Sequence, residues 1–199
     1  MTPVIDKTPV IDKTPTTQKP PPIPKYKLNE FTRSLKHTLL TTRFNEKTWE
    51  ENRQFCKRSV NGHQCIYSSP RPVSINIPPG GVIFVLEMHN GLNQIMGIGM
   101  IKNIPCEKKN IYEDGNYNRV SYSGKFRIDR TEMSSSELEI LTLLEKYCFK
   151  GKTHLKRGQG LTGFPVRMMY RLNYEKEQPI HVVDSITVMF KQRLERERK

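Results

Sequence analysis

Two apolar runs separated by a polar turn constrain the fold of this chain more than any other feature. Residues 82–89 read VIFVLEMH, residues 94–101 read QIMGIGMI, and the turn between them contains Asn-Gly at 90–91. Short apolar runs of this length are typical of strands, and Asn-Gly favours a tight turn between two strands. The pattern therefore predicts an antiparallel β-hairpin.

The second of these runs carries glycine at two alternate positions, Gly97 and Gly99. Alternate residues of a strand lie on one face of the sheet. Because glycine leaves that face without side chains, we expect another backbone or a ligand to approach the sheet closely there.

Helical patterns precede and follow the hairpin. The predicted helices cover residues 28–40, 49–58, 135–148 and 185–198. In the first, apolar residues recur at the spacing of one helical face. The second and third each follow a capping box, Thr48-x-x-Glu51 and Ser134-x-x-Glu137. The fourth ends in a run of solvated charge.

Other short apolar runs predict further strands at residues 64–68, 72–77 and 119–128. Residues 166–174 are predicted as one more strand or as a short helix. Helices and strands do not alternate regularly along the chain, so the predicted class is α+β and not a parallel α/β fold. We expect a small curved β-barrel or sheet with flanking helices.

The N-terminal segment has a separate composition. Residues 2–25 form four imperfect hexapeptides, each with proline second and lysine last. Proline at this density favours a disordered, polyproline-like tail, which is interpreted as a spacer, as a ligand for a protein partner, or as a solvated arm without a partner. The predicted division is a tail over 1–25, an α+β domain over 26–184 and a basic C-terminal helix or tail over 185–199.

The charge of the chain predicts an anionic partner. Lys and Arg number 33 against 20 Asp and Glu, which gives a formal net charge of +13. Nucleic acid is the first partner that such a balance indicates, and an anionic membrane surface is the second. No apolar run is long enough to span a bilayer, and no signal-peptide core is present, so we expect an intracellular protein, cytoplasmic or nuclear. The four cysteines are then expected to be reduced thiols.

The cations are densest between residues 146 and 173, which hold seven Lys or Arg and no Asp or Glu. Glycines in this stretch allow backbone N–H groups to approach phosphate oxygens, and the cations supply charge. The spacing does not match a Walker A loop. A solubilising loop is the alternative. The predicted phosphate contacts are Lys150, Lys152, His154, Lys156, Arg157, Gln159, Arg167 and Arg171.

Aromatic and amide side chains predict a pocket for one base. The residues assigned to it are Trp49, Tyr67, His89, Asn90 and Asn93. Amides and a histidine read base edges, and aromatic rings stack on bases. Tyr117 and Tyr122 are further candidates for stacking on a single strand. Turn formation by the asparagines and ordinary packing of the rings are the alternatives.

The sequence predicts neither a metal site nor a cofactor. Cys56, His63 and Cys65 are close in sequence, but their spacing lacks the second ligand pair of a zinc site. No Cys–His spacing favours a catalytic pair, so a non-enzymatic protein is predicted.

A family resemblance agrees with these expectations. A capped helix, CIYSSP, GGVIFVLEMHN, a polar turn and QIMGIGMIKN, within residues 45–165, resemble the PUA-like superfamily, which includes EVE, YTH and ASCH modules. The resemblance implies a small barrel that binds nucleic acid and holds one extruded base in an aromatic-walled pocket. The same block also resembles uncharacterised proteins of large DNA viruses.

The resulting hypothesis is a nucleic-acid-binding module, for DNA or RNA, that holds the phosphate backbone with its basic glycine-rich stretch. Two alternatives remain at this point. One is a virion or assembly protein that coats packaged genome without reading bases, and the other is an enzyme that acts on nucleic acid.

Overall fold

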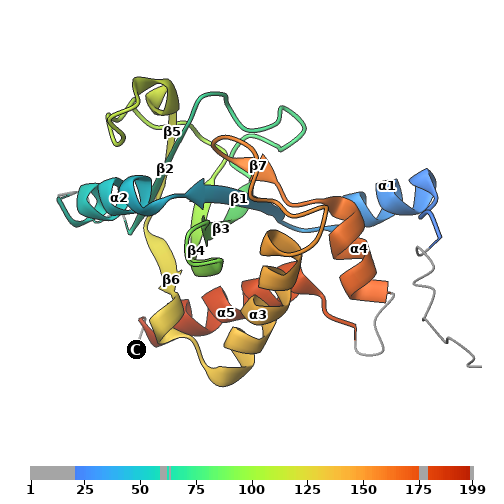
Figure 1. The fold of residues 1–199 in the computed structure, drawn as a ribbon. Coiled ribbons are helices and arrows are strands. Elements are labelled where there is room, and N and C mark those ends of the chain that lie inside the picture. Colours follow the sequence, from blue (N-terminus) through green and yellow to red (C-terminus); the bar gives the residue numbers. More distant parts are fainter. Residues whose placement is uncertain (1–20, 59–61, 63, 175–178, 198–199) are drawn as a thin grey trace, which may run out of the picture.

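The computed structural model describes residues 21–58, 62, 64–174 and 179–197 (Figure 1). The predicted repeat tail lies outside these residues as far as residue 20. The elements in chain order are α1 (Lys25–Ser34), β1 (Thr38–Phe44), α2 (Glu46–Arg58), β2 (Cys65–Ser69), β3 (Val82–His89), β4 (Gln94–Lys102), the 3₁₀ helix η1 (Gly115–Asn118), β5 (Val120–Gly124), β6 (Phe126–Asp129), the 3₁₀ helix η2 (Arg130–Glu132), α3 (Ser135–Phe149), β7 (Thr162–Gly163), α4 (Val166–Tyr174) and α5 (Val182–Arg196).

The main sheet is open and has five strands in the order β6-β4-β3-β1-β7. β1 is parallel to β3, and the other neighbouring strands are antiparallel. β2 and β5 form a separate two-stranded sheet. The α+β class is thereby confirmed. Of the two predicted forms, a small barrel or a sheet, the barrel is wrong, because the edge strands β6 and β7 do not pair with each other. Closure would require a continuous hydrogen-bonded ring of strands, and β7 contributes only two residues.

The predicted hairpin is confirmed. β3 and β4 pair in antiparallel register from Val82 opposite Lys102 to His89 opposite Gln94. The register shifts between Leu86 and Met88, which pair with Ile98 and Ile95. Met96 and Gly97 of β4 therefore lie opposite the single residue Glu87, so the extra residue of this β-bulge is on β4.

The helix predicted over residues 28–40 is wrong in its second half. α1 ends at Ser34, and β1 begins at Thr38. β1 is buried on both faces, with Leu39 in one core and Leu40 in the other. A strand of this kind lacks the apolar–polar alternation that reveals a strand in sequence. Leu39 and Leu40 were therefore compatible with a helical pattern as well, and the helix was predicted to continue to residue 40.

Other predicted boundaries shift by a few residues. Asn45 caps α2, because Thr48 N donates to Asn45 Oδ1 at 2.8 Å and Asn45 N donates to Thr48 Oγ1 at 3.0 Å. The helix therefore starts ahead of the predicted cap at Thr48. The run at 72–77 is a loop and not a strand, and the run at 166–174 is helical.

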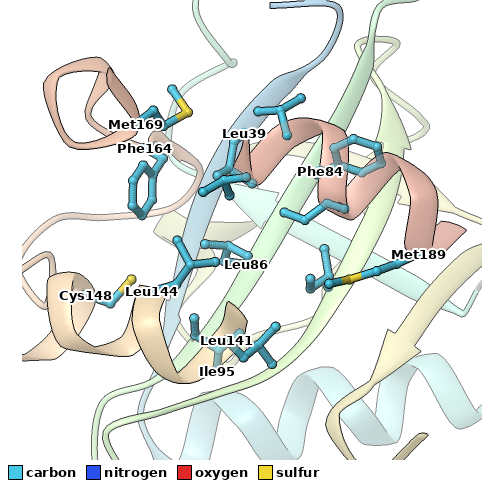
Figure 2. Packing of buried hydrophobic residues seen from close by; sticks show 14 of the residues in the cluster. Leu39, Phe84, Leu86, Ile95, Leu141, Leu144, Cys148, Phe164, Met169 and Met189 are labelled. Atoms are coloured by element: carbon cyan, nitrogen blue, oxygen red, sulfur yellow. The ribbon is translucent and has the colours of Figure 1, made fainter. Parts of the chain in front are cut away.

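The main sheet separates two cores. α1, α3, α4 and α5 cover one face, where Leu86 and Leu144 are among the fully buried side chains that meet (Figure 2). α2 and the β2–β5 sheet cover the other face, where Val85 packs with Tyr67 and Tyr122. α5, which the sequence set apart as a basic segment, contributes several apolar side chains to the first core. In the part of the chain that the structure describes, no helix has the length and apolar character needed to cross a bilayer.

The predicted capping box of α3 is confirmed, and a cation from α5 reinforces it. Ser134 and Glu137 form both hydrogen bonds of the box. Arg193 donates to the two carboxylate oxygens of Glu137 at 2.7 and 2.9 Å. The hydrogen bonds from Arg193 hold the pKa of Glu137 down to about 2.

We expect Arg193→Ala to destabilise the fold at neutral pH and to lose this effect in acid. A carboxylate whose pKa is lowered in the folded state stabilises the fold above its unfolded pKa, near 4.5, and loses this contribution as the pH falls towards 2. Urea unfolding at several pH values would measure the difference between variant and wild type, with Lys191→Ala on the same helix as the control. A difference that stays constant through this range would contradict the assignment.

Candidate nucleic-acid interface

The segment 150–161, called here the basic loop, crosses the end of the main sheet at which β1 and β3 finish. Arg43 at the end of β1 donates through Nε to the carbonyl oxygen of Leu155. Asn90, in the turn after β3, donates through Nδ2 to the carbonyl oxygen of Lys156 at 3.2 Å. Two strand ends therefore hold the backbone of the loop in place.

The loop then closes against the end of β2. Leu161 N donates to Ser69 Oγ at 3.3 Å. Gly160 has φ +62°, and a Cβ atom there would lie 2.8 Å from Ser69 Cβ and 2.9 Å from Pro70 Cδ. Only glycine combines this left-handed backbone with so close an approach.

The cations of the basic loop remain available. Lys150, Lys152 and Arg157 are exposed, and Lys156 is half-buried. Among the residues that the structure describes, none of these four has a carboxylate within ion-pairing distance. His154 is half-buried, and its Nδ1 accepts from Lys156 N at 3.3 Å, so its ring supports the local turn.

A pocket of about 470 Å³ lies beside the basic loop. Its walls come from the end of β1, the first turns of α2, residues 112–117, Asn90 and loop residues 158–160. Two predicted contacts, Asn90 and Gln159, are therefore brought to one cavity from segments far apart in the sequence. The amide group of each can donate and accept hydrogen bonds.

Aromatic side chains also reach this pocket. Tyr117, on η1, is half-buried and lies edge-on to the buried Tyr112, with ring centroids 6.3 Å apart and an interplanar angle of 79°. Tyr117 was one of the two tyrosines predicted to stack on a strand. The other, Tyr122, is buried in the core, and its hydroxyl accepts from Val73 N at 3.2 Å.

The pocket beside the basic loop also contains acidic side chains. Glu51, Glu113 and Asp114 line it. Glu113 forms an ion pair with Lys47. Glu51 is within ion-pairing distance of no cation among the described residues, although its charge, after that of Glu113, helps to raise the pKa of Lys47. Two cations, Arg43 and Lys47, also line the pocket, but Lys47 is paired with Glu113 and Arg43 donates to Leu155 and Thr162. Cations without a carboxylate partner among the described residues lie along the neighbouring loop.

The structure corrects most of the predicted base pocket. Tyr67 is 0% exposed and His89 is 1% exposed, so neither ring can wall an open pocket. Asn93 is exposed and has φ +54°, which makes it a turn residue. Trp49 is half-buried on α2 and does not line the cavity, although its ring lies edge-on to that of the lining residue Phe44, with centroids 5.3 Å apart. Of the five predicted residues, only Asn90 lines it.

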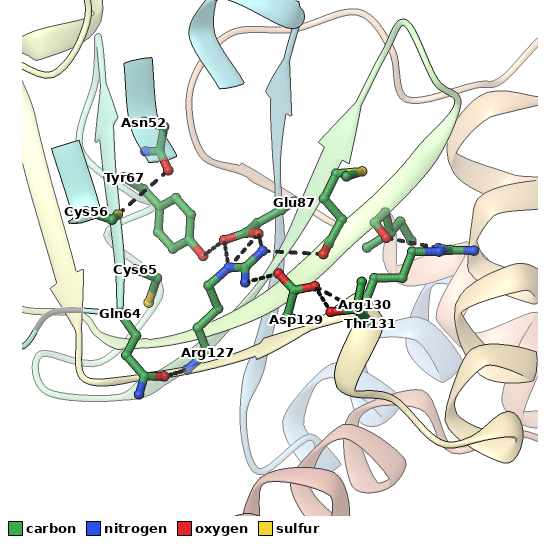
Figure 3. Close-up of polar contacts among 12 residues, drawn as sticks. Asn52, Cys56, Gln64, Cys65, Tyr67, Glu87, Arg127, Asp129, Arg130 and Thr131 are labelled. Carbon is green, nitrogen blue, oxygen red and sulfur yellow. Dashed lines mark hydrogen bonds and ion pairs between the residues drawn. The ribbon is translucent and has the colours of Figure 1, made fainter. Parts of the chain in front are cut away.

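Tyr67 belongs to a buried polar network that ties the two sheets together (Figure 3). Its hydroxyl donates to Glu87 Oε1 at 2.7 Å. Arg127 on β6 donates to Glu87 Oε2 through Nε at 2.9 Å and Nη2 at 2.7 Å, and to Asp129 Oδ2 through Nη1 at 2.6 Å. Thr131 completes the network by donating to Asp129 Oδ1, so each of these four groups has a hydrogen-bond partner, which is typical of a structural network.

The pKa values in this network follow from burial and charge. Burial and the nearby Cys65 and Glu87 raise the pKa of Tyr67 well above its ordinary value, so its hydroxyl stays protonated and donates. Burial lowers the pKa of Arg127, but the charge and hydrogen bonds of Glu87 outweigh this effect and raise it above its ordinary value. Burial raises the pKa of Asp129, but the hydrogen bonds from Arg127 and Thr131 outweigh this effect and lower the pKa to about 2.

A second cavity, of about 730 Å³, lies between α2, β6 and α5. Its lining includes Arg127 and Arg193, which are already bound to carboxylates, and also the acidic Glu132 and Glu197. No described residue of the basic loop lines this cavity. This cavity is therefore not part of the candidate site beside the basic loop.

Two predicted phosphate contacts lie elsewhere. β7 runs antiparallel to β1, and Phe164 N donates to the carbonyl oxygen of Leu39 at 3.0 Å. The chain therefore leaves the pocket towards the start of β1, where α4 packs beside α1 (Figure 1). Arg167 and Arg171, on α4, follow β7 in the chain and are not among the residues that line the pocket beside the basic loop.

Cys65 and Cys148 are buried in the described part of the chain. Burial raises the pKa of both Cys65 and Cys148 to about 12, so neither is a thiolate near neutral pH. His63 lies outside the described residues. Within the described ranges, no group of three His, Cys, Asp or Glu side chains is placed to hold a metal ion.

Comparisons with protein-family models, with curated proteins and with solved structures found no match. The interpretation of the site therefore depends on its geometry and chemistry. They are a basic loop whose cations have no carboxylate partner among the described residues and, beside it, a pocket lined by aromatic, amide and charged side chains.

Proposed function

We propose that this protein binds single-stranded nucleic acid, holding the phosphate backbone with the basic loop and one base in the adjacent pocket. One observation carries the proposal: loop residues 158–160 form a wall of the pocket, directly after the cations Lys156 and Arg157. A strand whose phosphates contact these cations would therefore bring a base to the pocket.

The chemistry of the two parts supports this division. Lysine and arginine attract phosphate, and flexible glycine backbone lets N–H groups approach the phosphate oxygens. Tyr117 offers a ring for stacking, while Asn90 and Gln159 offer hydrogen bonds to a base edge. Bases are accessible for such contacts when the strand is unpaired, which favours single-stranded nucleic acid as the ligand.

The PUA-like resemblance supports the same activity, although the main sheet is open. The virion or assembly alternative needs basic charge alone, and a pocket has no role in it. The adjoining pocket therefore favours a protein that contacts bases over one that only coats a genome.

The proposal is tested by fluorescence anisotropy with labelled single-stranded DNA and RNA of about ten nucleotides. We expect the logarithm of affinity to fall linearly with the logarithm of salt between about 50 and 300 mM KCl. Lys156→Ala/Arg157→Ala should weaken binding about tenfold at low salt and reduce the slope by about 1.4, since each single-strand phosphate contact contributes about 0.7.

The matched control removes two exposed cations at the other end of the sheet. Lys102 ends β4 opposite the start of β3, and Lys125 precedes β6. Lys102→Ala/Lys125→Ala lowers the net charge equally and should leave affinity and slope close to wild type. A flat salt response, or equal losses in the two double variants, would overturn the proposal.

A further inference from the structure

The carboxylates of the pocket beside the basic loop indicate what kind of group it accepts. Three carboxylates line this cavity of about 470 Å³ in a protein of net charge +13: Glu51, Glu113 and Asp114. The two cations that line it, Arg43 and Lys47, are already bound, Lys47 to Glu113 and Arg43 to the carbonyl oxygen of Leu155 and to Thr162 Oγ1. Carboxylates repel phosphate oxygens, so the phosphate of a bound strand belongs outside the pocket, on the loop. What carboxylates bind well are N–H donors.

Glu51 is the carboxylate best placed to bind such a donor. Lys47 already neutralises Glu113, and Asp114 Oδ1 accepts from Asn116 N at 2.9 Å. Glu51 is half-buried on α2, and only its Oε1 is used, accepting from Glu113 N at 3.2 Å. Among the described residues nothing donates to its Oε2, and Oε1 keeps a second lone pair.

Asn90 supplies an independent observation. Its Nδ2 donates to the carbonyl oxygen of Lys156, which fixes the orientation of the amide. Its Oδ1 is then buried and finds no donor in the part of the chain that the structure describes. A buried acceptor without a partner is destabilising, so a ligand that carries N–H groups would satisfy it.

Guanine has the donor pattern that matches a carboxylate. Its N1–H and N2 amino group lie side by side and can bind the two carboxylate oxygens together. Adenine and cytosine place one amino group beside a ring-nitrogen acceptor, which repels a carboxylate. Uracil and thymine place one N–H between two carbonyl groups. Only guanine therefore presents two adjacent donors without an intervening acceptor.

We infer that the pocket selects guanine, with Glu51 binding its Watson–Crick edge and Tyr117 stacking on its ring. This inference rests on the proposed function and adds the identity of the base. The N–H donors that Gln159 contributes to the pocket suit the acceptors O6 and N7 of guanine. Phosphates on either side of this base would contact the basic loop.

The inference is tested with oligonucleotides that carry one variable base within a uracil or thymine run, measured by competition. We expect guanine to bind about tenfold more tightly than adenine, cytosine or uracil, in the range of one bidentate base contact. Inosine, which lacks the N2 amino group, should lose most of that preference. Glu51→Gln should reduce the preference to about twofold and leave the salt slope unchanged.

Glu50→Gln is the matched control. Glu50 is exposed on the same helix, and its Oε1 accepts from Gln54 Nε2 at 2.8 Å. Removal of its charge should leave the guanine preference intact. Salt-dependent binding without base preference, or a preference that survives Glu51→Gln, would overturn this inference and leave the proposed function standing. Absence of salt-dependent binding to every oligonucleotide would instead overturn the proposed function.

Discussion

Arg127→Ala is expected to lower the free energy of unfolding by about 3–5 kcal/mol, the range observed when one partner of a buried ion pair is removed. Glu87 is 0% exposed, and the side chain of Arg127 is 6% exposed. Without the guanidinium, the hydroxyl of Tyr67 would be the one hydrogen-bond donor left to the Glu87 carboxylate among the side chains that the structure describes. Urea unfolding followed by circular dichroism measures the loss.

Two further variants define this effect. Adding Glu87→Gln to Arg127→Ala should recover part of the stability, since the double variant leaves no buried charge. Arg119→Ala, which removes an exposed arginine, should stay within about 0.5 kcal/mol of wild type. A loss below about 1 kcal/mol for Arg127→Ala would mean that the network contributes little to the fold.

Gly99→Ala is expected to cost about 3 kcal/mol, at the upper end of the usual cost of overpacking. A Cβ atom at Gly99 would lie 2.8 Å from Tyr67 Cζ and 3.0 Å from Cys65 Sγ. Both neighbours are fully buried on β2, and the hydroxyl of Tyr67 is bound to Glu87. The ring therefore cannot move aside without breaking the network.

Gly115→Ala is the control for this substitution. Gly115 begins η1, does not have a positive φ, and has no atom within 4 Å of the position that a Cβ would take. Its replacement should change stability by less than about 0.5 kcal/mol. Similar midpoints for the two variants in thermal and urea unfolding would contradict the close approach of the two sheets at Gly99.

Side chains of neighbouring strands approach the alternate glycines Gly97 and Gly99 of β4. The sequence suggested that a backbone or ligand approaches the bare face of the second hairpin strand. Tyr67 and Cys65 of the second sheet approach Gly99, and the guanidinium of Arg127 approaches Gly97. Side chains from other strands therefore occupy this face, and the identity of those strands depends on the sheet order.

The candidate site was predictable only in part. Asn90, Gln159 and Tyr117 each had a chemical type and local position that suggested nucleic-acid contacts, and all three line one pocket. Glu51 was noted only as half of a capping box, and Tyr112 carried no signal. Both are brought to the pocket by the packing of α2 against β1 and of the segment before η1.

Local patterns were sufficient for the β3–β4 hairpin, the capping box of α3, the α+β class and the density of cations in the basic loop. Each of these depends on residues within a few positions of one another, where turn chemistry, capping and charge act directly. The strand β1, the open sheet, the burial of Tyr67 and the convergence of Glu51 with the basic loop were decided by contacts between distant segments. A residue buried on all sides has no periodic signature, and a charge run does not specify which surface it faces, so only the folded arrangement could establish them.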